Sequence, residues 1–375
     1  MIDGCDTLDV TTSFVTIIVV YLGRTLLPVI ALIPFKGRCF KPLRISQRTR
    51  FMREKMAASA STDGDREDHL VHRYDSPFLS SDSNDQKSLP PAALIILNTP
   101  IINHNNPNKG VESYELPGVL NALWQSSSYR ICADGGANRL YEATVASHEA
   151  LHSQETASSR SFLPDLITGD LDSLLPHVQE FYEHRGVPIV RIEDQDYHDL
   201  DKALMAVENW LDERDSTNDI PTVSKLKSKV FIYGGFGGRF DQEMGCINAL
   251  FVWGQRRKFR HTSMALYGEE TCAFILPALP KTCEVRIRFP NGDDANSSNN
   301  AKGQYIVGEG PTCGLIPLGG RCDEVITTGL KWNLDGNLPL EFGGLVSSSN
   351  RVINELVTVK SSSALVFTAE IITKR

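Results

Sequence analysis

The feature that most constrains the fold is a regular alternation of short apolar stretches with longer amphipathic ones in the middle of the chain. The apolar stretches are 91–98, 129–136, 165–168, 187–192 and 228–235, and the stretches with helical character are 116–125, 138–150, 176–186, 200–213 and 240–257. Nearly continuous apolar strands that alternate with helices are typical of a parallel sheet covered by helices on both faces. We therefore predict an α/β domain over residues 91–262.

The pattern changes after about residue 262. Short alternating segments follow at 282–289, 304–310, 313–320, 323–332, 354–360 and 364–372, and turns rich in Gly, Asn and Ser separate them. Such segments are typical of an antiparallel sandwich or barrel. The predicted fold class is thus α/β, with an N-terminal Rossmann-like domain built on a parallel sheet and a C-terminal antiparallel domain over residues 263–375.

The first 90 residues are predicted to be a leader and a flexible, disordered lead-in. Residues 13–35 are apolar and about long enough to cross a bilayer, but Arg24 and two prolines interrupt them, and a central arginine is costly in lipid. This segment could be a membrane anchor, a targeting sequence or translated sequence upstream of a later start. Residues 57–90 are rich in Ser, Asp and Asn, which favours a flexible connection. A membrane location is disfavoured.

Charge is distributed unevenly along the chain. Of 38 Lys and Arg and 46 Asp and Glu residues, nine and four lie in residues 1–56, which leaves 29 basic and 42 acidic residues in the remainder. An acidic body argues against nucleic acid as a partner, because clustered cations must neutralise the phosphates. Gathered carboxylates suit a divalent metal ion instead. Eight cysteines without a C-x-x-C pair favour reduced, buried thiols in a cytoplasmic protein.

Charged motifs follow four of the predicted strands at the point where each strand ends. They carry Asp134; Asp170 and Asp172; Asp194, Asp196 and Asp199; and Arg239 with Asp241. Because ligands bind beyond the carboxyl ends of the strands in an open α/β sheet, the carboxylates are expected to converge where a cation neutralises them. Asp170 and Asp172 point the same way if the chain is extended there. The set predicts a Mg²⁺ site with positions left for phosphate oxygens, although any one aspartate could instead cap a helix or close a turn.

Three further features each have a functional and a structural interpretation. The glycine-rich segment at 233–242 would let backbone amides approach a phosphate that Arg239 also contacts, or it forms a tight turn with a surface arginine. It matches neither the dinucleotide-binding fingerprint nor the P-loop. Lys202 could neutralise a phosphate or be a solvated helix residue. Trp332 could stack on a flat cationic ring or pack in the core.

Taken in order, the segments CADGGANRLY, LPDLITGDLDSL, DQDYHDLDKAL and GGRFDQEMGCINAL resemble the thiamine pyrophosphokinase family, as do CGLIPLGGRCDEVITTGLKWNL and LEFGGLVSSSN further on. The resemblance runs from about residue 91 to 372. It implies an α/β catalytic domain that binds ATP and Mg²⁺, followed by an antiparallel β-sandwich that binds thiamine, in a homodimer with shared active sites. The implied reaction moves the pyrophosphoryl group of the co-substrate ATP to the hydroxyl of thiamine and gives thiamine diphosphate and AMP.

The resemblance also implies roles for individual residues. Asp170, Asp172 and Asp199 would bind magnesium; Gln195, Asp196, Lys202, Arg239 and Asp241 would surround the nucleotide, with Asp134 and Asn138 nearby; and Trp332, beside Ser347, Ser349 and Asn350, would pack on thiamine in the active site of the other subunit. Phosphoryl-type transfer depends on alignment and charge neutralisation, which makes Asp172, Asp199, Lys202 and Arg239 the candidate catalytic residues. Asp172 or Asp199 could accept the hydroxyl proton. His198 stands where the family usually has threonine.

Two other functions remain open from the sequence. A metal-dependent hydrolase of nucleoside or thiamine phosphates would use the same carboxylates with water as the acceptor. A non-catalytic thiamine sensor would not need Lys202 beside the carboxylates. Trp332 in its separate β-domain favours a heterocyclic acceptor, so the kinase is the preferred interpretation.

Overall fold

The computed structural model describes residues 20–22, 25–27, 71–78, 91–101, 116–146, 162–217, 228–256, 259, 262–288 and 306–374. The chain divides into two compact units, Met1–Ser61 and Thr62–Arg375. In the first unit, strands β1 (Val20–Leu22) and β2 (Thr25–Leu27) pair antiparallel. Most of the predicted leader and lead-in lies outside the described residues. Among the described helices, none is both long and apolar enough to cross a bilayer.

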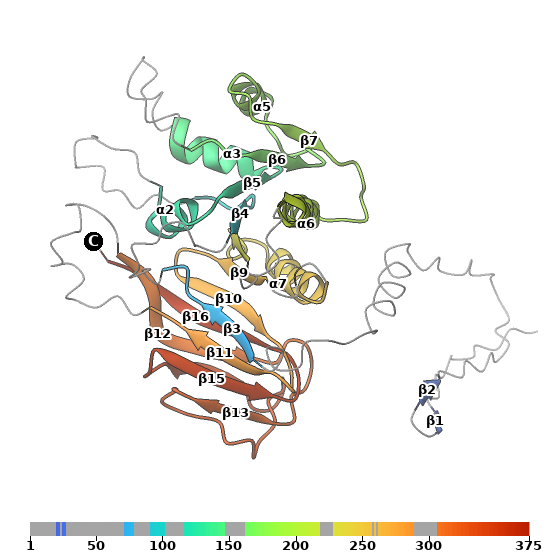
Figure 1. Cartoon of the computed structure of the whole chain (residues 1–375), viewed down its shortest axis with the longest axis vertical. Helices are drawn as coiled ribbons and strands as arrows, with labels where there is room; N and C mark the ends of the chain where they lie inside the picture. The colour runs from blue at the N-terminus through green and yellow to red at the C-terminus, as the bar shows by residue number, and fades with distance from the viewer. Residues whose placement is uncertain are drawn as a thin grey trace, which may run out of the picture. The chain divides into compact units, whose positions relative to one another are not determined.

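A ten-stranded sheet runs through the second unit, and part of it is parallel (Figure 1). The parallel strands are β4 (Ala92–Ile96), β5 (Tyr129–Ala133), β6 (Leu166–Gly169), β7 (Ile189–Arg191), β8 (Lys229–Tyr233) and β9 (Ser263–Tyr267), in the spatial order β9-β8-β4-β5-β6-β7. All of β4 is buried, as expected for a strand covered on both faces. The sheet therefore continues past the predicted domain boundary, because β9 follows residue 262.

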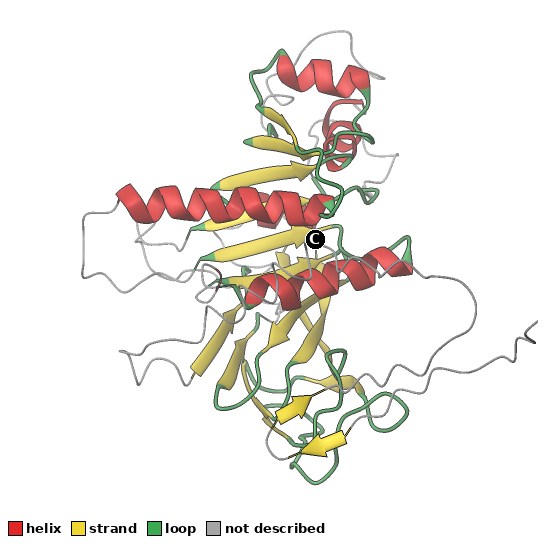
Figure 2. Ribbon diagram, turned by 90° about the vertical axis from the view of Figure 1, so that its right-hand side faces the viewer, coloured by secondary structure: helices red, strands yellow, loops and turns green. Residues whose placement is uncertain are grey.

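Helices cover both faces of the parallel strands. On one face lie α2 (Gly118–Gln125), α3 (Gly136–Tyr141) and α5 (Pro176–Glu183), and on the other lie α6 (Asp199–Thr217) and α7 (Phe240–Gly254) (Figure 2). Leu120 of α2 shares a buried cluster with Leu94 of β4, whereas Trp253 of α7 shares another with the next strand residue, Ile95. Successive strand residues point to opposite faces, so the two clusters are the two faces of the sheet. A π-helical turn, Glu142–Ala146, follows α3.

Beyond β9 the same sheet continues with antiparallel strands, and a second sheet packs against it. The continuation is β10 (Thr271–Leu276), β16 (Leu365–Lys374), β12 (Ile306–Ile316) and β14 (Ser347–Arg351), in that order. The second sheet has the order β13-β15-β11-β3, from β13 (Val325–Thr328), β15 (Leu356–Ser361), β11 (Thr282–Arg286) and β3 (Val71–Asp75). Phe274 and Phe367 of the first sheet are buried in one cluster with Val285 and Val357 of the second. An α/β half with a β-rich second half is thus confirmed.

The β-rich half differs from the prediction in three ways. Strands β9, β10 and β14 lie where the sequence predicts none. The segments at 304–310 and 313–320 contribute to a single strand, β12, whose register shifts between Glu309 and Cys313. The prediction of a flexible lead-in is wrong for β3, which pairs in parallel with β11. Tyr74 of β3 stacks on Phe274 with ring centroids 3.6 Å apart. Contacts with distant strands, rather than local periodicity, order this segment.

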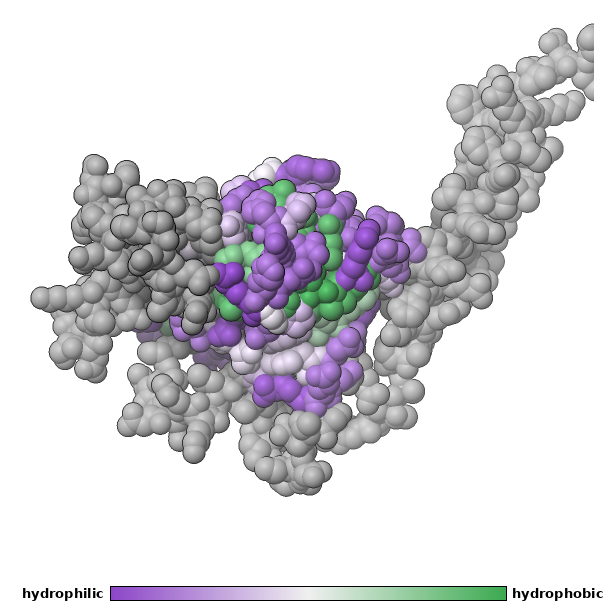
Figure 3. Space-filling model, turned by 90° about the horizontal axis from the view of Figure 1, so that it is seen from above, coloured by the Kyte–Doolittle hydropathy of each residue, from purple (hydrophilic) through white to green (hydrophobic). Residues whose placement is uncertain are grey.

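The end of the sheet at β7 faces away from the β-rich half. Seen from above, with α5 and β7 nearest the viewer, the described surface is mostly hydrophilic around a smaller apolar patch (Figure 3). The edge strand β7 has only three residues, and a short edge strand limits pairing with other chains. The carboxyl ends of β5 and β6 lie close to this edge of the sheet.

Candidate active site

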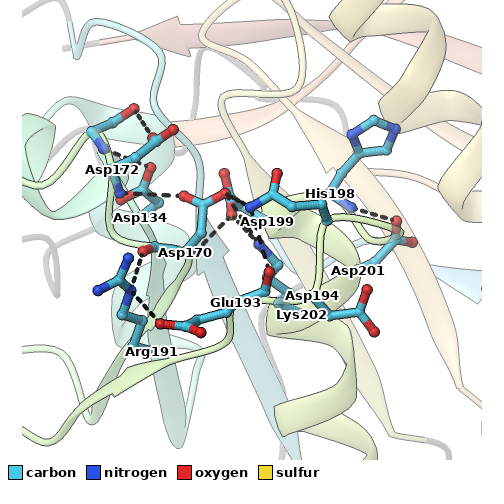
Figure 4. Close-up of polar contacts among 12 residues, drawn as sticks. Asp134, Asp170, Asp172, Arg191, Glu193, Asp194, His198, Asp199, Asp201 and Lys202 are labelled. Carbon is cyan, nitrogen blue, oxygen red and sulfur yellow. Dashed lines mark hydrogen bonds and ion pairs between the residues drawn. The ribbon is translucent and has the colours of Figure 1, made fainter.

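Three carboxylates meet at the carboxyl edge of the parallel sheet (Figure 4). Asp134 follows β5, Asp170 follows the neighbouring strand β6, and Asp199 begins α6. One oxygen of each lies within 4.8 Å of the others. The approach requires glycine at the end of β6, because a Cβ atom on Gly169 would lie 2.7 Å from the Cβ of Asp134. The predicted convergence of acidic side chains from separate strands is thus present in the structure.

Asp134 is the most buried member of this triad. The residue is 3% exposed and has a left-handed backbone with a φ of 45°. Its Oδ2 accepts a hydrogen bond of 3.3 Å from the Ser173 backbone N–H, while its buried Oδ1 has no hydrogen-bond partner among the described residues. Burial, together with the Asp199 carboxylate, raises the pKa of Asp134 above its ordinary value. Because burying a charge without a partner is costly, this oxygen is suited to a cation.

Lys202 lies beneath the triad rather than in solvent. Its Nζ is 3.4 Å from Oδ2 of Asp170 and 3.3 Å from Oδ1 of Asp199, and the residue is 1% exposed. Burial raises the pKa of Asp170, but the Asp172 backbone N–H and the Lys202 ammonium outweigh it and hold that pKa below its usual value. The interpretation of Lys202 as a solvated helix residue is therefore wrong, and the lysine contacts the carboxylates directly.

Asp172 does not join the triad, although the sequence predicts it as a metal ligand. The premise of an extended chain is wrong, because Leu171 has a φ of 63° in the left-handed region. This turn directs Asp172 toward Ser173, whose hydroxyl donates to its Oδ1 at 3.0 Å. The Asp172 backbone N–H instead donates to Oδ1 of Asp170 at 3.2 Å. Asp134, which the sequence also places at a strand end, is the third carboxylate of this group.

The remaining residues of this edge hold the loops around the triad. Gln195 donates from Nε2 to Oδ2 of Asp170 at 3.4 Å, whereas Asp196 is exposed and its backbone N–H donates to Oδ1 of Asp194. Asn138 donates from Nδ2 to the Ser173 carbonyl at 2.7 Å, and its Oδ1 accepts from the Leu175 backbone N–H at 3.1 Å. Asn138 therefore fixes the loop that carries two of the predicted aspartates.

The glycine-rich loop between β8 and α7 lies at the same edge of the sheet. Arg239 and Asp241 form an exposed ion pair there, with Nε of the arginine 3.0 Å from Oδ1 of the aspartate. Gly237 has a φ of 88°, which glycine adopts readily, and its N–H donates to Glu243 Oε1 at 2.7 Å. The arginine is thus on a turn at the surface and contacts Asp241 rather than the triad.

Trp332 is the centre of a second group of predicted residues. Its side chain is 55% exposed, so packing in the core is excluded, and the Lys331 ammonium lies 4.5 Å from the ring centroid. Asn350 of β14 accepts from the Trp332 backbone N–H at 3.3 Å and donates to its carbonyl at 2.8 Å. The amide also donates to the Ser347 hydroxyl at 3.3 Å, and Ser349 has a left-handed backbone with a φ of 55°. These contacts hold the tryptophan in an exposed position.

The two groups lie near opposite ends of the ten-stranded sheet. Trp332 is attached to β14 through Asn350, and Asp170 follows β6. The strand order places eight inter-strand spacings between β14 and β6, which at about 4.8 Å each is roughly 38 Å. One small ligand cannot contact both groups within one chain.

Comparisons with known proteins identify the family. The model of the thiamin pyrophosphokinase catalytic domain matches residues 120–262, and that of the vitamin B1 binding domain matches residues 298–366. Thiamine pyrophosphokinase 1 of rice, Oryza sativa subsp. japonica, is 35% identical over 260 residues, which cover 69% of this chain and 84% of the rice protein. The chain belongs to the thiamine pyrophosphokinase family.

Other relatives agree with this assignment. Thiamine pyrophosphokinase 1 of Arabidopsis thaliana is 34% identical, and the match covers 70% of this chain and 85% of that protein. The structure of thiamin pyrophosphokinase from Candida albicans is 26% identical with a TM-score of 0.54, and the match covers 76% of this chain and 90% of that one. The yeast thiamin pyrophosphokinase structure, at 22% identity and a TM-score of 0.59, covers 83% of this chain and 95% of that one and shares the fold.

Family membership makes the chain an enzyme of the transferase class. The matches give no support to the hydrolase that the sequence left open as an alternative. The matched regions of the thiamine pyrophosphokinase models contain both groups of site residues, since the triad lies in 120–262 and Trp332 lies in 298–366.

Proposed function

We propose that the chain transfers the pyrophosphoryl group of ATP to the hydroxyl of thiamine, which gives thiamine diphosphate and AMP. The observation that carries this proposal is the triad of Asp134, Asp170 and Asp199, within 4.8 Å of one another, in a chain of the thiamine pyrophosphokinase family. Three carboxylates this close repel one another, and the single charge of Lys202, which pairs with Asp170 and Asp199, offsets only part of this repulsion. A protein with this fold but no catalytic activity would not require three carboxylates at this position.

We assign the triad to Mg²⁺, and the residues present fit this ion. All the donors are carboxylate oxygens, which magnesium prefers, and the buried Oδ1 of Asp134 lacks a partner in the described part of the chain. Asp134, Asp170 and Asp199 would hold the ion. When bound, Mg²⁺ would neutralise phosphate oxygens of ATP and make the attacked phosphorus more electrophilic.

The other residues of the carboxyl edge would align the substrates. Lys202 keeps two carboxylates together and offsets part of their charge. The exposed ion pair of Arg239 with Asp241 contributes little to stability. Arg239 would leave this pair and make a forked contact with a phosphate. Asp172 lies beside the triad with its carboxylate at the surface, so we assign it rather than Asp199 as the acceptor of the thiamine hydroxyl proton. Asp199 is already paired with the lysine.

Thiamine would bind between two copies of the chain. Trp332 is held exposed by Asn350, and an exposed indole face attracts a cationic ring. Since the strands beside the two groups are separated by roughly 38 Å along the sheet, we assign the tryptophan of each site to a second subunit. This separation supports a homodimer in which each active site takes Asp170 from one protomer and Trp332 from its partner.

The domain boundaries and the location of the protein are also proposals. We assign residues 91–262 to ATP and Mg²⁺ binding and residues 263–375 to thiamine binding, which is supported by the positions of the triad and of Trp332. A cytoplasmic location is supported by the free cysteines, of which Cys132, Cys272, Cys283, Cys313 and Cys322 are buried, since a reducing compartment keeps thiols unpaired.

The direct test is incubation of the purified full-length chain with thiamine, ATP and Mg²⁺, followed by separation of the products. We expect equal amounts of AMP and thiamine diphosphate, with no product when a chelator removes the metal. A parallel incubation without thiamine tests the hydrolase. Formation of ADP or free pyrophosphate in place of thiamine diphosphate would contradict the proposal.

A further inference from the structure

We propose that Trp253 is a positioning residue for the carboxylate triad. Its indole N–H fixes Asp201, and Asp201 in turn fixes the first turn of α6, which carries Asp199 and Lys202. This inference rests on the proposed metal centre, but it concerns Trp253, which is not a member of the triad. It makes the packing of α7 against α6 part of the active site.

The first link is a buried hydrogen bond between the two helices. Trp253, near the end of α7, donates from Nε1 to Oδ1 of Asp201 at 2.7 Å. The tryptophan is 1% exposed and the aspartate 4% exposed. Breaking a hydrogen bond between two buried side chains is costly, because it leaves a polar group without a partner away from water. The indole therefore determines where the carboxylate of Asp201 lies.

The second link joins Asp201 to the start of its own helix. The other oxygen, Oδ2, accepts a hydrogen bond of 3.1 Å from the His198 backbone N–H. His198 precedes α6, and its carbonyl accepts from the Lys202 backbone N–H at 3.1 Å. This is one half of a capping box, in which an acidic residue at the third helical position reaches back to the residue before the helix. Asp201 thereby fixes the geometry of the first turn.

The position of His198 makes this link more important here. A threonine at this position would supply a hydroxyl that caps the helix from the other side. Histidine is not among the preferred capping residues. In this chain the start of α6 therefore depends on the carboxylate of Asp201, and the placement of that carboxylate depends on Trp253.

Trp253 is itself held in place by a second contact between the helices. The guanidinium of Arg256 lies 3.5 Å from the centroid of the indole ring. The same guanidinium pairs with Glu208 of α6, with Nη1 of the arginine 3.1 Å from Oε2 of the glutamate. The ring is thus fixed by Arg256 on its face and by Asp201 at its edge, so it cannot turn without breaking one of the two contacts.

The consequence for the triad follows from the spacing along α6. Asp199 and Lys202 lie three residues apart on the first turn. The Lys202 ammonium pairs with Asp170 and with Asp199, and the Asp199 carboxylate lies beside that of Asp170. Asp134 and Asp170, in contrast, follow strands. A shift of the turn would separate Asp199 from the other two carboxylates, and metal sites tolerate displacements of only about 0.5 Å.

The experiment compares Trp253→Phe with Trp124→Phe in the full-length protein. Both changes remove a buried indole N–H and keep an aromatic ring, but Trp124 lies on α2, on the opposite face of the sheet. Mn²⁺ binding without substrates is measured by electron paramagnetic resonance, and thermal unfolding is followed in parallel. Loss of a hydrogen-bond partner of a metal ligand typically weakens metal binding about 10- to 100-fold. Trp253 acts one contact further out, through Asp201, so we expect a loss near the lower end of this range for Trp253→Phe alone.

A purely structural tryptophan would give a different result. It would lower the unfolding temperature and leave the Mn²⁺ affinity of the folded protein unchanged, which would overturn the proposal. Asp201→Asn provides a second variant, because an amide can accept from only one of the two donors; it should weaken Mn²⁺ binding in the same direction. If the wild-type protein itself binds no Mn²⁺, the proposed metal centre fails as well, and that outcome is distinct from equal binding by wild type and Trp253→Phe.

Discussion

Lys202 Nζ lies 3.4 Å from Oδ2 of Asp170, and the lysine is 1% exposed. The aspartate follows β6 and the lysine belongs to α6, so their ion pair joins a strand end to a helix start. Removal of one partner of a buried pair leaves an uncompensated charge, which costs more than the pair itself contributes. The lysine therefore stabilises the carboxylate edge of the sheet before any ligand binds.

The substitution Lys202→Met is expected to remove activity and to lower the free energy of unfolding. Loss of a fully buried pair costs 3 to 5 kcal/mol, and because Asp170 is partly exposed we expect about 2 kcal/mol in urea unfolding. Lys331→Met is the control for stability, since that lysine lies over the exposed Trp332 ring. Equal unfolding curves for Lys202→Met and wild type would show that the pair has no structural role.

Asp134→Asn and Asp172→Asn are expected to separate metal binding from proton transfer. Asp134→Asn should weaken Mn²⁺ binding at least 10-fold. It should also raise thermal stability at a pH well above the ordinary carboxyl pKa, because burial raises the pKa of Asp134 and the folded protein therefore disfavours its charged form. Asp172→Asn should abolish turnover and leave Mn²⁺ affinity within about threefold of wild type. The two affinities, measured by titration calorimetry, decide the assignment, and the reverse order would restore Asp172 as the ligand.

Trp332→Ala is expected to raise the KM for thiamine by at least 10-fold with little change in the KM for ATP, because stacking on a desolvated cation contributes about 2 kcal/mol. Leu338→Ala, which also removes an exposed apolar side chain, serves as the control. Steady-state kinetics with each substrate varied in turn measure both constants. A thiamine KM equal to that of wild type would be incompatible with stacking.

The shared active site makes a prediction of its own. Mixed dimers that combine a Trp332→Ala subunit with an Asp170→Asn subunit should contain one intact site. Both substitutions fall in one of the two active sites, and the other site receives the intact Asp170 of the first subunit and the intact Trp332 of the second. Differently tagged subunits purified as heterodimers would recover up to about half of wild-type turnover, whereas at limiting thiamine Asp170→Asn alone is inactive and Trp332→Ala alone is reduced at least about 10-fold. Absence of recovery in verified heterodimers would exclude a site built from two chains.

Glu309 predicts how stability depends on pH. Its side chain is fully buried between the sheets, where Oε2 accepts hydrogen bonds from the Ser76 hydroxyl at 2.7 Å and the Arg288 backbone N–H at 3.0 Å. Burial raises its pKa to about 7, above the value of about 4.3 in an unfolded chain. The folded state therefore holds the proton more tightly, so the free energy of unfolding falls as pH rises from about 4 to about 7 and then levels off.

Glu309→Gln should remove this part of the pH dependence, because glutamine keeps an acceptor for Ser76 and does not ionise. Each unit of pKa difference corresponds to about 1.4 kcal/mol, so the variant should gain on wild type by about 3 kcal/mol between pH 5 and pH 8. Urea unfolding at each pH provides the measurement. Parallel profiles for the two proteins would mean that Glu309 ionises in the folded state as it does in water.

His198→Thr is expected to stabilise the protein. The threonine hydroxyl would accept a hydrogen bond from the first turn of α6 and complete the capping box that Asp201 begins. Substitutions at this helical position change stability by about 1 kcal/mol, which thermal unfolding resolves. His184→Thr, at the C-terminal end of α5, is the control and should show no gain. A lower unfolding temperature for His198→Thr would indicate that the imidazole makes a contact that stabilises the protein more than the threonine cap does.

The parallel half of the fold and the position of the site could be predicted because both depend on local pattern. Buried runs such as 92–96 become central strands, and acidic residues after parallel strands meet at one edge. The left-handed turn at Leu171 could not be predicted, because leucine rarely adopts it and a neighbouring structure must impose it. Nor could the docking of β3 onto β11, since only the distant pairing partner orders that strand.

The central claim is that carboxylates from three separate elements hold one divalent ion that binds the phosphates of ATP. Crystals of the full-length protein with Mn²⁺ and a non-hydrolysable ATP analogue test it directly through the anomalous scattering of manganese. We predict a peak within about 2.5 Å of oxygens of Asp134, Asp170 and Asp199, with phosphate oxygens completing the coordination. A peak elsewhere on the protein, or one held by Asp172 without Asp134, would contradict the account.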